Sequence, residues 1–231
     1  LDSIMMEVLN QVFSELKKKP DIKMISFVGE GKHFSFGASV EEHTKENAAR
    51  MLKNFHQMFY NIIDLSVPTL SKISGQCLGG GLELALICNF MFADTSAKLG
   101  QPEIMLGVFP PPASVLLPLK IGSARAEELL ITGKTISANT ARDIGLLNYV
   151  FESKDELQQE TDKWIQKFIL PKSASSLRYA VAAARISLNK TVKEKLAELE
   201  SIYVKKLMET HDANEGINSF LEKRKAEWKN S

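Results

Sequence analysis

Two glutamates, Glu83 and Glu103, each end a short segment whose residues are typical of a tight turn. Glu83 ends the run Gly79-Gly80-Gly81-Leu82-Glu83, and Glu103 ends the run Gly100-Gln101-Pro102-Glu103. A carboxyl group can orient or deprotonate a water molecule, or deliver a proton to carbon. Each glutamate is equally well explained as an acidic residue that complements the dipole at the start of a helix. Taken one at a time, the two segments leave both explanations open.

The glycine run also predicts backbone donors for a developing negative charge. Three glycines between a strand and a helix allow positive φ and a close approach of a ligand. The N–H groups at such a helix start have no intrahelical partner, which is what an oxyanion hole requires. A second small-residue segment, Phe34-Ser35-Phe36-Gly37-Ala38-Ser39, follows another predicted strand and by itself is typical of a turn. Two carboxylates together with two backbone loops suit the chemistry of an enolate.

Other chemistries find less support in the sequence. Neither a dinucleotide fingerprint nor a phosphate-binding loop follows the glycines. No histidine lies in a nucleophile motif, and surface or capping roles are expected for His33 and His43. Cys77 and Cys88 lack metal-ligand spacing. We therefore expect two reduced thiols, no bound metal and a cytoplasmic protein.

Composition limits the class of protein. The 231 residues are enough for one large domain, or for one domain with a small helical appendage. Apolar residues make up 44%, and Lys plus Arg total 29 against 28 for Asp plus Glu, which gives a net charge of +1. This balance offers no electrostatic reason to expect nucleic acid or an anionic membrane as a partner. No apolar run reaches the length of a membrane span.

Hydrophobic periodicity predicts an α/β domain followed by helices. Helices are predicted over 1–16, about 45–64 and 82–88, and strands over 24–28, 69–74, 90–93 and 146–151. A short helix between the last two strands begins after Ser137 and ends before Gly145. Four more helices are predicted over 154–169, 174–189, 192–210 and 215–228. The alternation predicts a largely parallel sheet within a core of residues 1–152, with a helical subdomain over 153–231.

Five stretches resemble the crotonase (enoyl-CoA hydratase/isomerase) superfamily. They are GKHFSFGASVEE, SGQCLGGGLELALICNFMFAD, AKLGQPEIMLGVFP, LLITGKTISANTARDIGLLNYVF and EGINSFLEKRKAEW. The second resembles the family's G-x-x-x-G-G-G-x-E-L-A-L-x-C-D signature, and the third resembles its F-G-x-P-E-x-x-L-G-x-x-P motif. The resemblance implies a spiral of ββα repeats, a C-terminal helical subdomain for oligomerisation, and trimers or hexamers. It also implies an N-terminal hairpin, which this sequence does not include.

The resemblance assigns roles residue by residue. It places the oxyanion hole on the backbone N–H groups of Ala38 and Gly80, and the catalytic carboxyls on Glu83 and Glu103. Members that add water carry both glutamates, so hydration of an acyl-CoA substrate without a further cofactor is expected. The resemblance implies that Glu83 positions the water and Glu103 moves the proton, and it leaves shared or exchanged roles open.

Departures from the family pattern bear on the acyl group. Bulky Phe36 replaces a small residue, Ser39 replaces an acidic one, and the run Phe109-Pro110-Pro111-Pro112 replaces a glycine-rich loop. Prolines stiffen a loop and remove backbone donors. The residues expected to contact the substrate are Phe36, Gly37, Gly79, Phe109 and Pro110.

These departures favour a cyclic dienoyl thioester, as in members that act in anaerobic benzoyl-CoA breakdown, over a straight chain. A general enoyl-CoA hydratase/isomerase and a ring-opening oxo-acyl-CoA hydrolase are the alternatives within the enzyme class. A non-catalytic assembly subunit is disfavoured because both glutamates are retained. An RNA-binding relative is disfavoured because the basic clusters 17–19 and 223–225 resemble solvated helix ends.

Overall fold

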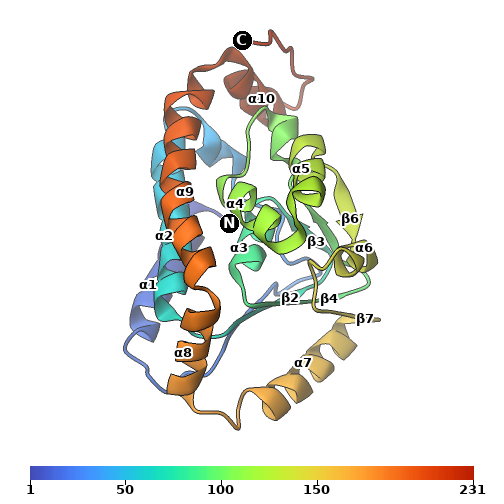
Figure 1. The fold of residues 1–231 in the computed structure, drawn as a ribbon. Coiled ribbons are helices and arrows are strands. Elements are labelled where there is room, and N and C mark those ends of the chain that lie inside the picture. The colour runs from blue at the N-terminus through green and yellow to red at the C-terminus, as the bar shows by residue number, and fades with distance from the viewer.

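The computed structural model describes residues 1–231 as a mixed α/β protein (Figure 1). The helices are α1 (Ser3–Leu16), α2 (Ala48–Leu65), α3 (Gly80–Ile87), α4 (Pro111–Ile121), α5 (Ser123–Thr132), α6 (Ala138–Asp143), α7 (Lys154–Phe168), α8 (Ala174–Ala184), α9 (Ile186–Lys205) and α10 (His211–Leu221). Three short 3₁₀ helices are η1 (Val40–His43), η2 (Pro102–Leu106) and η3 (Leu207–Glu209). The strands are β1 (Ile25–Val28), β2 (Thr69–Ile73), β3 (Gln76–Leu78), β4 (Phe90–Asp94), β5 (Lys98–Gly100), β6 (Thr135–Ser137) and β7 (Tyr149–Phe151).

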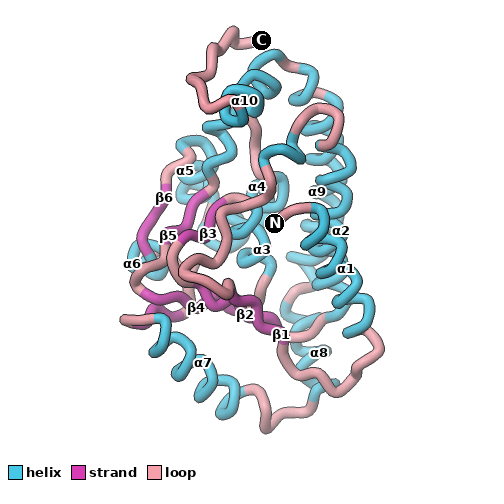
Figure 2. The backbone as a smooth tube through the Cα atoms, turned by 180° about the vertical axis from the view of Figure 1, so that it is seen from behind, coloured by secondary structure: helices cyan, strands magenta, loops and turns pink.

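The strands form two sheets, which Figure 2 shows in magenta. In the first sheet, β1, β2, β4 and β7 lie in that order and are all parallel. In the second sheet, β5 pairs with β3 in parallel and with β6 in antiparallel orientation. After β2 and after β4, the chain gives one strand to the second sheet and then a helix. This repeated strand–strand–helix order confirms the predicted spiral and its largely parallel sheet.

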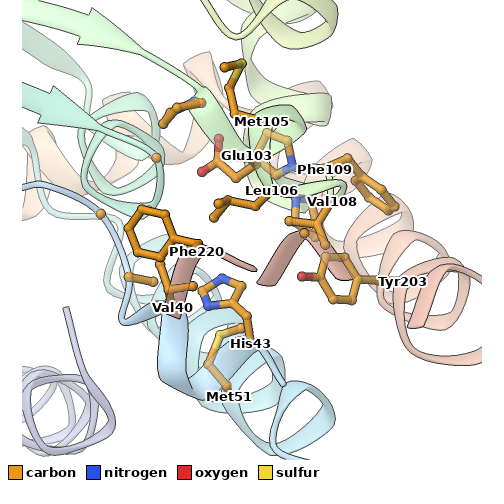
Figure 3. Close-up of a pocket in the computed structure, with 18 of the residues that line it drawn as sticks. Val40, His43, Met51, Glu103, Met105, Leu106, Val108, Phe109, Tyr203 and Phe220 are labelled. Carbon is orange, nitrogen blue, oxygen red and sulfur yellow. The ribbon is translucent and has the colours of Figure 1, made fainter. Parts of the chain in front are cut away.

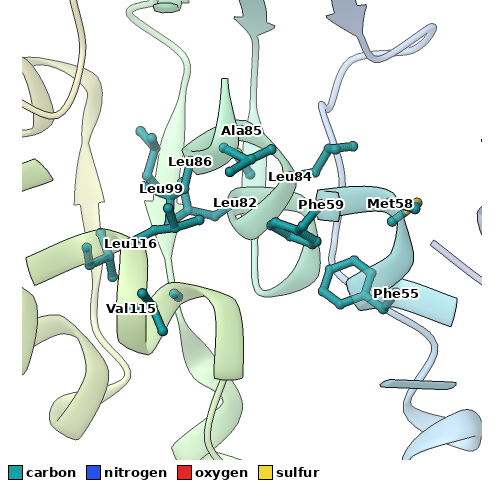
Figure 4. Close-up of a cluster of buried hydrophobic side chains, with 14 of the residues drawn as sticks. Phe55, Met58, Phe59, Leu82, Leu84, Ala85, Leu86, Leu99, Val115 and Leu116 are labelled. Carbon is teal, nitrogen blue, oxygen red and sulfur yellow. The ribbon is translucent and has the colours of Figure 1, made fainter. Parts of the chain in front are cut away.

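Helix α3 lies at the centre of the core. All of its residues are buried, as the apolar run on every side of this segment predicts. Figure 4 shows Phe55 and Phe59 of α2 on one side of α3, and Val115 and Leu116 of α4 on the other. Because α3 is enclosed by other elements, its first turn is held in a fixed place, and that turn carries Glu83.

Most predicted elements are confirmed with shifts at their ends, the largest for the last helix, which was predicted over 215–228 and spans His211–Leu221. Asp2 caps α1 by accepting from the backbone N–H of Met5, and Ser137 caps α6 by accepting from the N–H of Thr140. Gly145 follows α6 with a φ of 81°, as the C-terminal prediction requires. The short strands β3, β5 and β6 were not predicted, and neither were α4 and α5. Strands of three residues are too short to show a clear alternation of apolar residues.

The prediction of a loop at the proline run is wrong. Pro111 and Pro112 form the first turn of α4, and Pro110 is its N-cap. A helix tolerates proline in its first turn because the N–H groups there have no intrahelical partner. The predicted removal of backbone donors by the prolines is confirmed, because Ala113 is the first residue of α4 that has an N–H group.

The predicted division between the second and third tail helices, near residue 190, is also wrong. The chain leaves helical geometry at Arg185, where α8 ends and α9 begins. The guanidinium group of Arg185 donates to the carbonyl oxygens of Ile87 (2.6 Å) and Cys88 (2.7 Å), at the C-terminal end of α3. This contact between distant segments has no counterpart in the local hydrophobic pattern.

The tail helices pack on the α/β part of the chain. Helix α9 lies along α2 and α4, and α10 contacts η2 (Figure 1). The contact with η2 is very close, because a Cβ atom on Gly216 would lie 2.1 Å from the carbonyl oxygen of Leu106. None of the helices is both long and apolar enough to cross a membrane.

Candidate active site

One cavity of about 540 Å³ collects all nine residues for which the sequence predicts a site role. They are Phe36, Gly37, Ala38, Gly79, Gly80, Glu83, Glu103, Phe109 and Pro110. The tail contributes a further wall, made of Tyr203, Gly216, Ser219, Phe220, Arg224 and Ala226. The predicted residues therefore lie together, and the segment 153–231 helps to enclose them.

Two glycine turns border the cavity and lie against each other. Gly37 has a φ of 111° and Gly79 a φ of 50°, conformations that residues with a Cβ atom rarely adopt. A Cβ atom on Gly80 would lie 3.1 Å from the Ala38 nitrogen, and one on Gly37 would lie 3.6 Å from the Gly80 nitrogen. Outside the helix and strand ladders, no hydrogen bond uses the N–H of Ala38 or of Gly80. Two adjacent backbone donors thus stand at the cavity and are free to bind an oxyanion.

Glu83 lies in the first turn of α3 and is only 3% exposed. Its Oε1 atom accepts a hydrogen bond of 2.9 Å from the backbone N–H of Ala113, at the start of α4. Burial raises the pKa of Glu83 well above its usual value, and the charge of Glu103 raises it further. The hydrogen bond from Ala113 opposes both effects. The carboxyl group is therefore fixed in place and favours its protonated form.

Glu103 approaches the same turn from η2. Its Oε1 atom would lie 2.6 Å from a Cβ atom on Gly79, so only glycine leaves room for the carboxyl group. Burial is the main cause that raises the pKa of Glu103 to about 7. A carboxyl group with this pKa exchanges its proton readily near neutral pH.

Gln101 orients the Glu103 carboxyl group, a role that the sequence does not predict. With its amide nitrogen facing Glu103, the fully buried Gln101 donates to both carboxylate oxygens, at 3.0 and 3.1 Å. The only signal in the sequence was its position two residues before Glu103 in the Gly-Gln-Pro-Glu run. That signal does not say which way the side chain points.

The remaining wall of the cavity is mainly apolar (Figure 3). Phe36 is 67% exposed and packs edge-on against His33, with 4.8 Å between the ring centroids. Phe109 packs edge-on against Tyr203 at 5.4 Å. Pro110 and Pro111 continue this wall into the first turn of α4. Bulky rings and prolines thus shape the space beside the two glutamates.

His43 and Tyr203 are polar residues that line the cavity without having been predicted from the sequence. The Nδ1–H group of His43 donates to the carbonyl oxygen of Ser39 (2.7 Å), which is a capping role as expected, yet the ring also lines the cavity. Burial lowers the pKa of His43, which favours the neutral ring. Tyr203 lies within the helix predicted over 192–210, for which the sequence predicts no role in the site.

The strand–strand–helix spiral and the glycine-bordered cavity with two buried carboxyl groups define an enzyme of the crotonase class. The family model described as enoyl-CoA hydratase/isomerase matches residues 1–231. The chain belongs to the enoyl-CoA hydratase/isomerase family.

Individual relatives agree with this assignment. The chain is 44% identical over 230 residues to the cyclohexa-1,5-dienecarbonyl-CoA hydratase of Thauera aromatica, a match that covers 100% of this chain and 88% of that protein. It is 34% identical to a probable enoyl-CoA hydratase of Bacillus subtilis, covering 99% and 90% of the two chains. The crystal structure of an enoyl-CoA hydratase from Bacillus anthracis is similar with a TM-score of 0.76 at 27% identity, covering 100% and 90%. An enoyl-CoA hydratase/isomerase from Pseudoalteromonas atlantica shares the fold with a TM-score of 0.85 at 22% identity, covering 99% and 90%.

Proposed function

We propose that this protein adds water to cyclohexa-1,5-diene-1-carbonyl-CoA and forms 6-hydroxycyclohex-1-ene-1-carbonyl-CoA. The observation that carries the proposal is the pair of buried glutamates, Glu83 and Glu103, beside two free backbone N–H groups in one cavity. Water addition needs a group that positions the water and a group that moves a proton, and the pair can supply both. The name of the Thauera aromatica relative supports the choice of acyl group.

In the proposed reaction, the water oxygen bonds to the ring carbon β to the thioester. The N–H of Ala113 holds Glu83, which positions the water. Glu103 takes one proton from this water. Electrons move from the attacked double bond to the thioester oxygen, and the N–H groups of Ala38 and Gly80 stabilise the resulting dienolate. Glu103 then returns a proton to the far end of the diene. The net change is the addition of one water, so no redox or metal cofactor is needed.

The shape of the cavity supports a ring over a straight chain. Phe36, Phe109 and Pro110 place flat, rigid surfaces around the space beside the glutamates. The aromatic side chains and the prolines of the wall lose little conformational entropy when a ligand binds. Such a rigid wall favours a compact, rigid acyl group. Removal of the apolar ring from water also stabilises the complex, by about 0.8 kcal/mol per buried CH₂ group.

A comparison of two substrates tests this proposal. We expect kcat/KM to be at least about 100-fold higher for cyclohexa-1,5-diene-1-carbonyl-CoA than for crotonyl-CoA, since misfit of an acyl group in an apolar pocket costs about 10- to 200-fold per methylene. Hydration of crotonyl-CoA can be followed by loss of absorbance of the conjugated thioester. The cyclic product is still a conjugated enoyl thioester, so it is separated from its substrate by liquid chromatography. Rapid turnover of crotonyl-CoA alone would identify a general enoyl-CoA hydratase instead. Release of a ring-opened acid would identify an oxo-acyl-CoA hydrolase.

We also propose that the chain forms trimers or hexamers through its tail helices. Support comes from large apolar side chains that stay exposed in and between α7, α8 and α9, namely Phe168, Leu170, Tyr179 and Ile186. A cytoplasmic location is proposed as well, because Cys77 and Cys88 are both free thiols, as expected in a reducing compartment. We expect neither nucleic acid nor a membrane as a partner.

A further inference from the structure

Tyr203 carries a buried hydroxyl group that has no hydrogen-bond partner in the protein. The residue is 1% exposed and its side chain lines the cavity. In Figure 3 the hydroxyl points away from α9, toward the side of the cavity where His43 and Glu103 lie. An unpaired hydroxyl group buried in this way destabilises the protein, because it has lost its hydrogen bonds to water. A ligand that restores the hydrogen bond would remove that cost.

The surroundings of Tyr203 keep its phenol protonated. Burial raises the pKa of Tyr203, and the charges of Glu103 and Glu83 raise it further. The other polar groups of the cavity are His43, which bonds to Ser39, Ser219, which bonds to the carbonyl of Gly216, and Arg224, which pairs with glutamates of its own segment. Tyr203 is therefore an available hydrogen-bond donor near both catalytic carboxyl groups.

Packing fixes the direction of the Tyr203 side chain. Its ring packs edge-on against Phe109, with centroids 5.4 Å apart and planes at 64°. Glu200 lies three residues earlier on α9, so it faces the same side of the helix. Its Oε2 atom accepts from the Nδ1 of His56 on α2 (2.8 Å). Because α9 is attached to α2 at this level, the hydroxyl group has little freedom to turn elsewhere.

We infer that the Tyr203 hydroxyl binds the oxygen that comes from water, first in the water molecule and then in the hydroxyl group of the product. This inference rests on the proposed hydration and names a third polar group for the same oxygen. Glu83 and Tyr203 would hold the water from two sides, with one lone pair of the water oxygen directed at the acyl group. After the carbon–oxygen bond forms, the same tyrosine accepts from or donates to the product hydroxyl. No covalent bond to Tyr203 forms or breaks.

The decisive experiment compares two ligands that differ only in one hydroxyl group. These are 6-hydroxycyclohex-1-ene-1-carbonyl-CoA and cyclohex-1-ene-1-carbonyl-CoA, and their Kd values are measured by calorimetry on wild type and on Tyr203→Phe. We expect the variant to bind the hydroxylated ligand about 5- to 100-fold more weakly, as for loss of a partner to a buried polar group. Binding of the hydroxyl-free ligand should change less than about twofold.

Tyr60→Phe is the matched control, since Tyr60 is a partly buried tyrosine on α2 that does not line the cavity. It should leave the affinity ratio of the two ligands unchanged. The free Tyr203→Phe variant should melt at the same temperature as wild type or higher, because the substitution removes an unpaired buried hydroxyl group. Equal weakening of both ligands, or an unchanged ratio in Tyr203→Phe, would overturn the inference.

Kinetics separate this inference from the proposed function. If wild type fails to hydrate cyclohexa-1,5-diene-1-carbonyl-CoA, the proposed substrate is wrong, and the binding ratio still tests whether Tyr203 recognises the hydroxyl. If wild type hydrates it and Tyr203→Phe has an unchanged kcat/KM, the substrate stands and the role of Tyr203 is wrong. We expect kcat/KM to fall about 10- to 100-fold in the variant.

Discussion

The two candidate catalytic glutamates sit in segments of very different construction. Glu83 belongs to α3, in which every residue is buried, and one backbone N–H from α4 fixes its carboxyl group. Glu103 belongs to η2, which has no fully buried residue and ends at Gly107 in the left-handed region. The Glu103 carboxyl group is held by the side chain of Gln101. One carboxyl group is thus held by the core and the other by its neighbours on a short turn.

This difference explains how two identical side chains can do different work. The deeper burial of Glu83 and the charge of Glu103 raise the pKa of Glu83 well above its usual value, so Glu83 suits the role of holding a water. The pKa of Glu103, about 7, suits repeated proton transfer near neutral pH. Environments that push two titrating groups apart in pKa are a general way to divide the roles of acid and base.

The largest effects should come from neutralising either glutamate. We expect Glu83→Gln and Glu103→Gln each to lower kcat about 10²- to 10⁴-fold, which is the usual contribution of general acid–base catalysis. Glutamine keeps the shape of the side chain, so melting temperatures should stay close to that of wild type. Glu83→Gln should retain a titration near pH 7 in its kcat/KM profile, which reports groups of the free enzyme, and Glu103→Gln should lose it. The exposed Glu127→Gln serves as control, and near-normal activity in either cavity variant would show that its role is misassigned.

A second, smaller effect should follow from adding one methyl group at Gly79. In Gly79→Ala, the new Cβ atom would lie 2.6 Å from Oε1 of Glu103, and the positive φ adds backbone strain. We expect kcat to fall about 10- to 100-fold because Glu103 is displaced, with about 1–3 kcal/mol lost from the free energy of unfolding.

Gly145→Ala is the matched control for Gly79→Ala. Gly145 has a φ of 81° and no heavy atom within 4 Å of the added Cβ atom, so it isolates the strain. Its loss of stability should be similar while kcat remains unchanged. A Gly79→Ala enzyme with normal kcat would mean that the position of Glu103 is not critical.

The smallest effect should come from Gln101→Leu, which removes the amide that orients Glu103. Hydrogen bonds to an ionised carboxylate lower its pKa, so their loss should raise the pKa of the Glu103 carboxyl group. The limb of the pH–rate profile near neutral pH should therefore move to higher pH, and kcat at pH 7 should fall about tenfold. A matching measurement on Glu83→Gln should show no such upward shift. A profile that stays in place in Gln101→Leu would exclude Gln101 as a partner of Glu103.

The sequence predicted which residues line the cavity better than it predicted the contacts that orient them. The two glutamates, the glycine turns and the apolar wall were predicted because each lies in a short local motif, and all of them line one cavity. The roles of Gln101 and Tyr203 depend on the direction in which a side chain points, which no local pattern records. The division of the tail at Arg185 depends on carbonyl groups almost one hundred residues earlier in the chain. The proline run correctly predicted that backbone donors would be missing. It did not predict that Pro111 begins a helix.

The close packing of α10 on η2 bears on how enzymes of this family can be recombined. Gly216 lets α10 approach the backbone beside Glu103, and Gly107 meets Asp212 in the same contact. A chimera that joined residues 1–152 to the tail of a relative would change the contact between α10 and η2, the turn that carries Glu103. Larger side chains at position 216 would have to push the turn away. The tail therefore cannot be exchanged as an independent module without affecting the turn that positions Glu103.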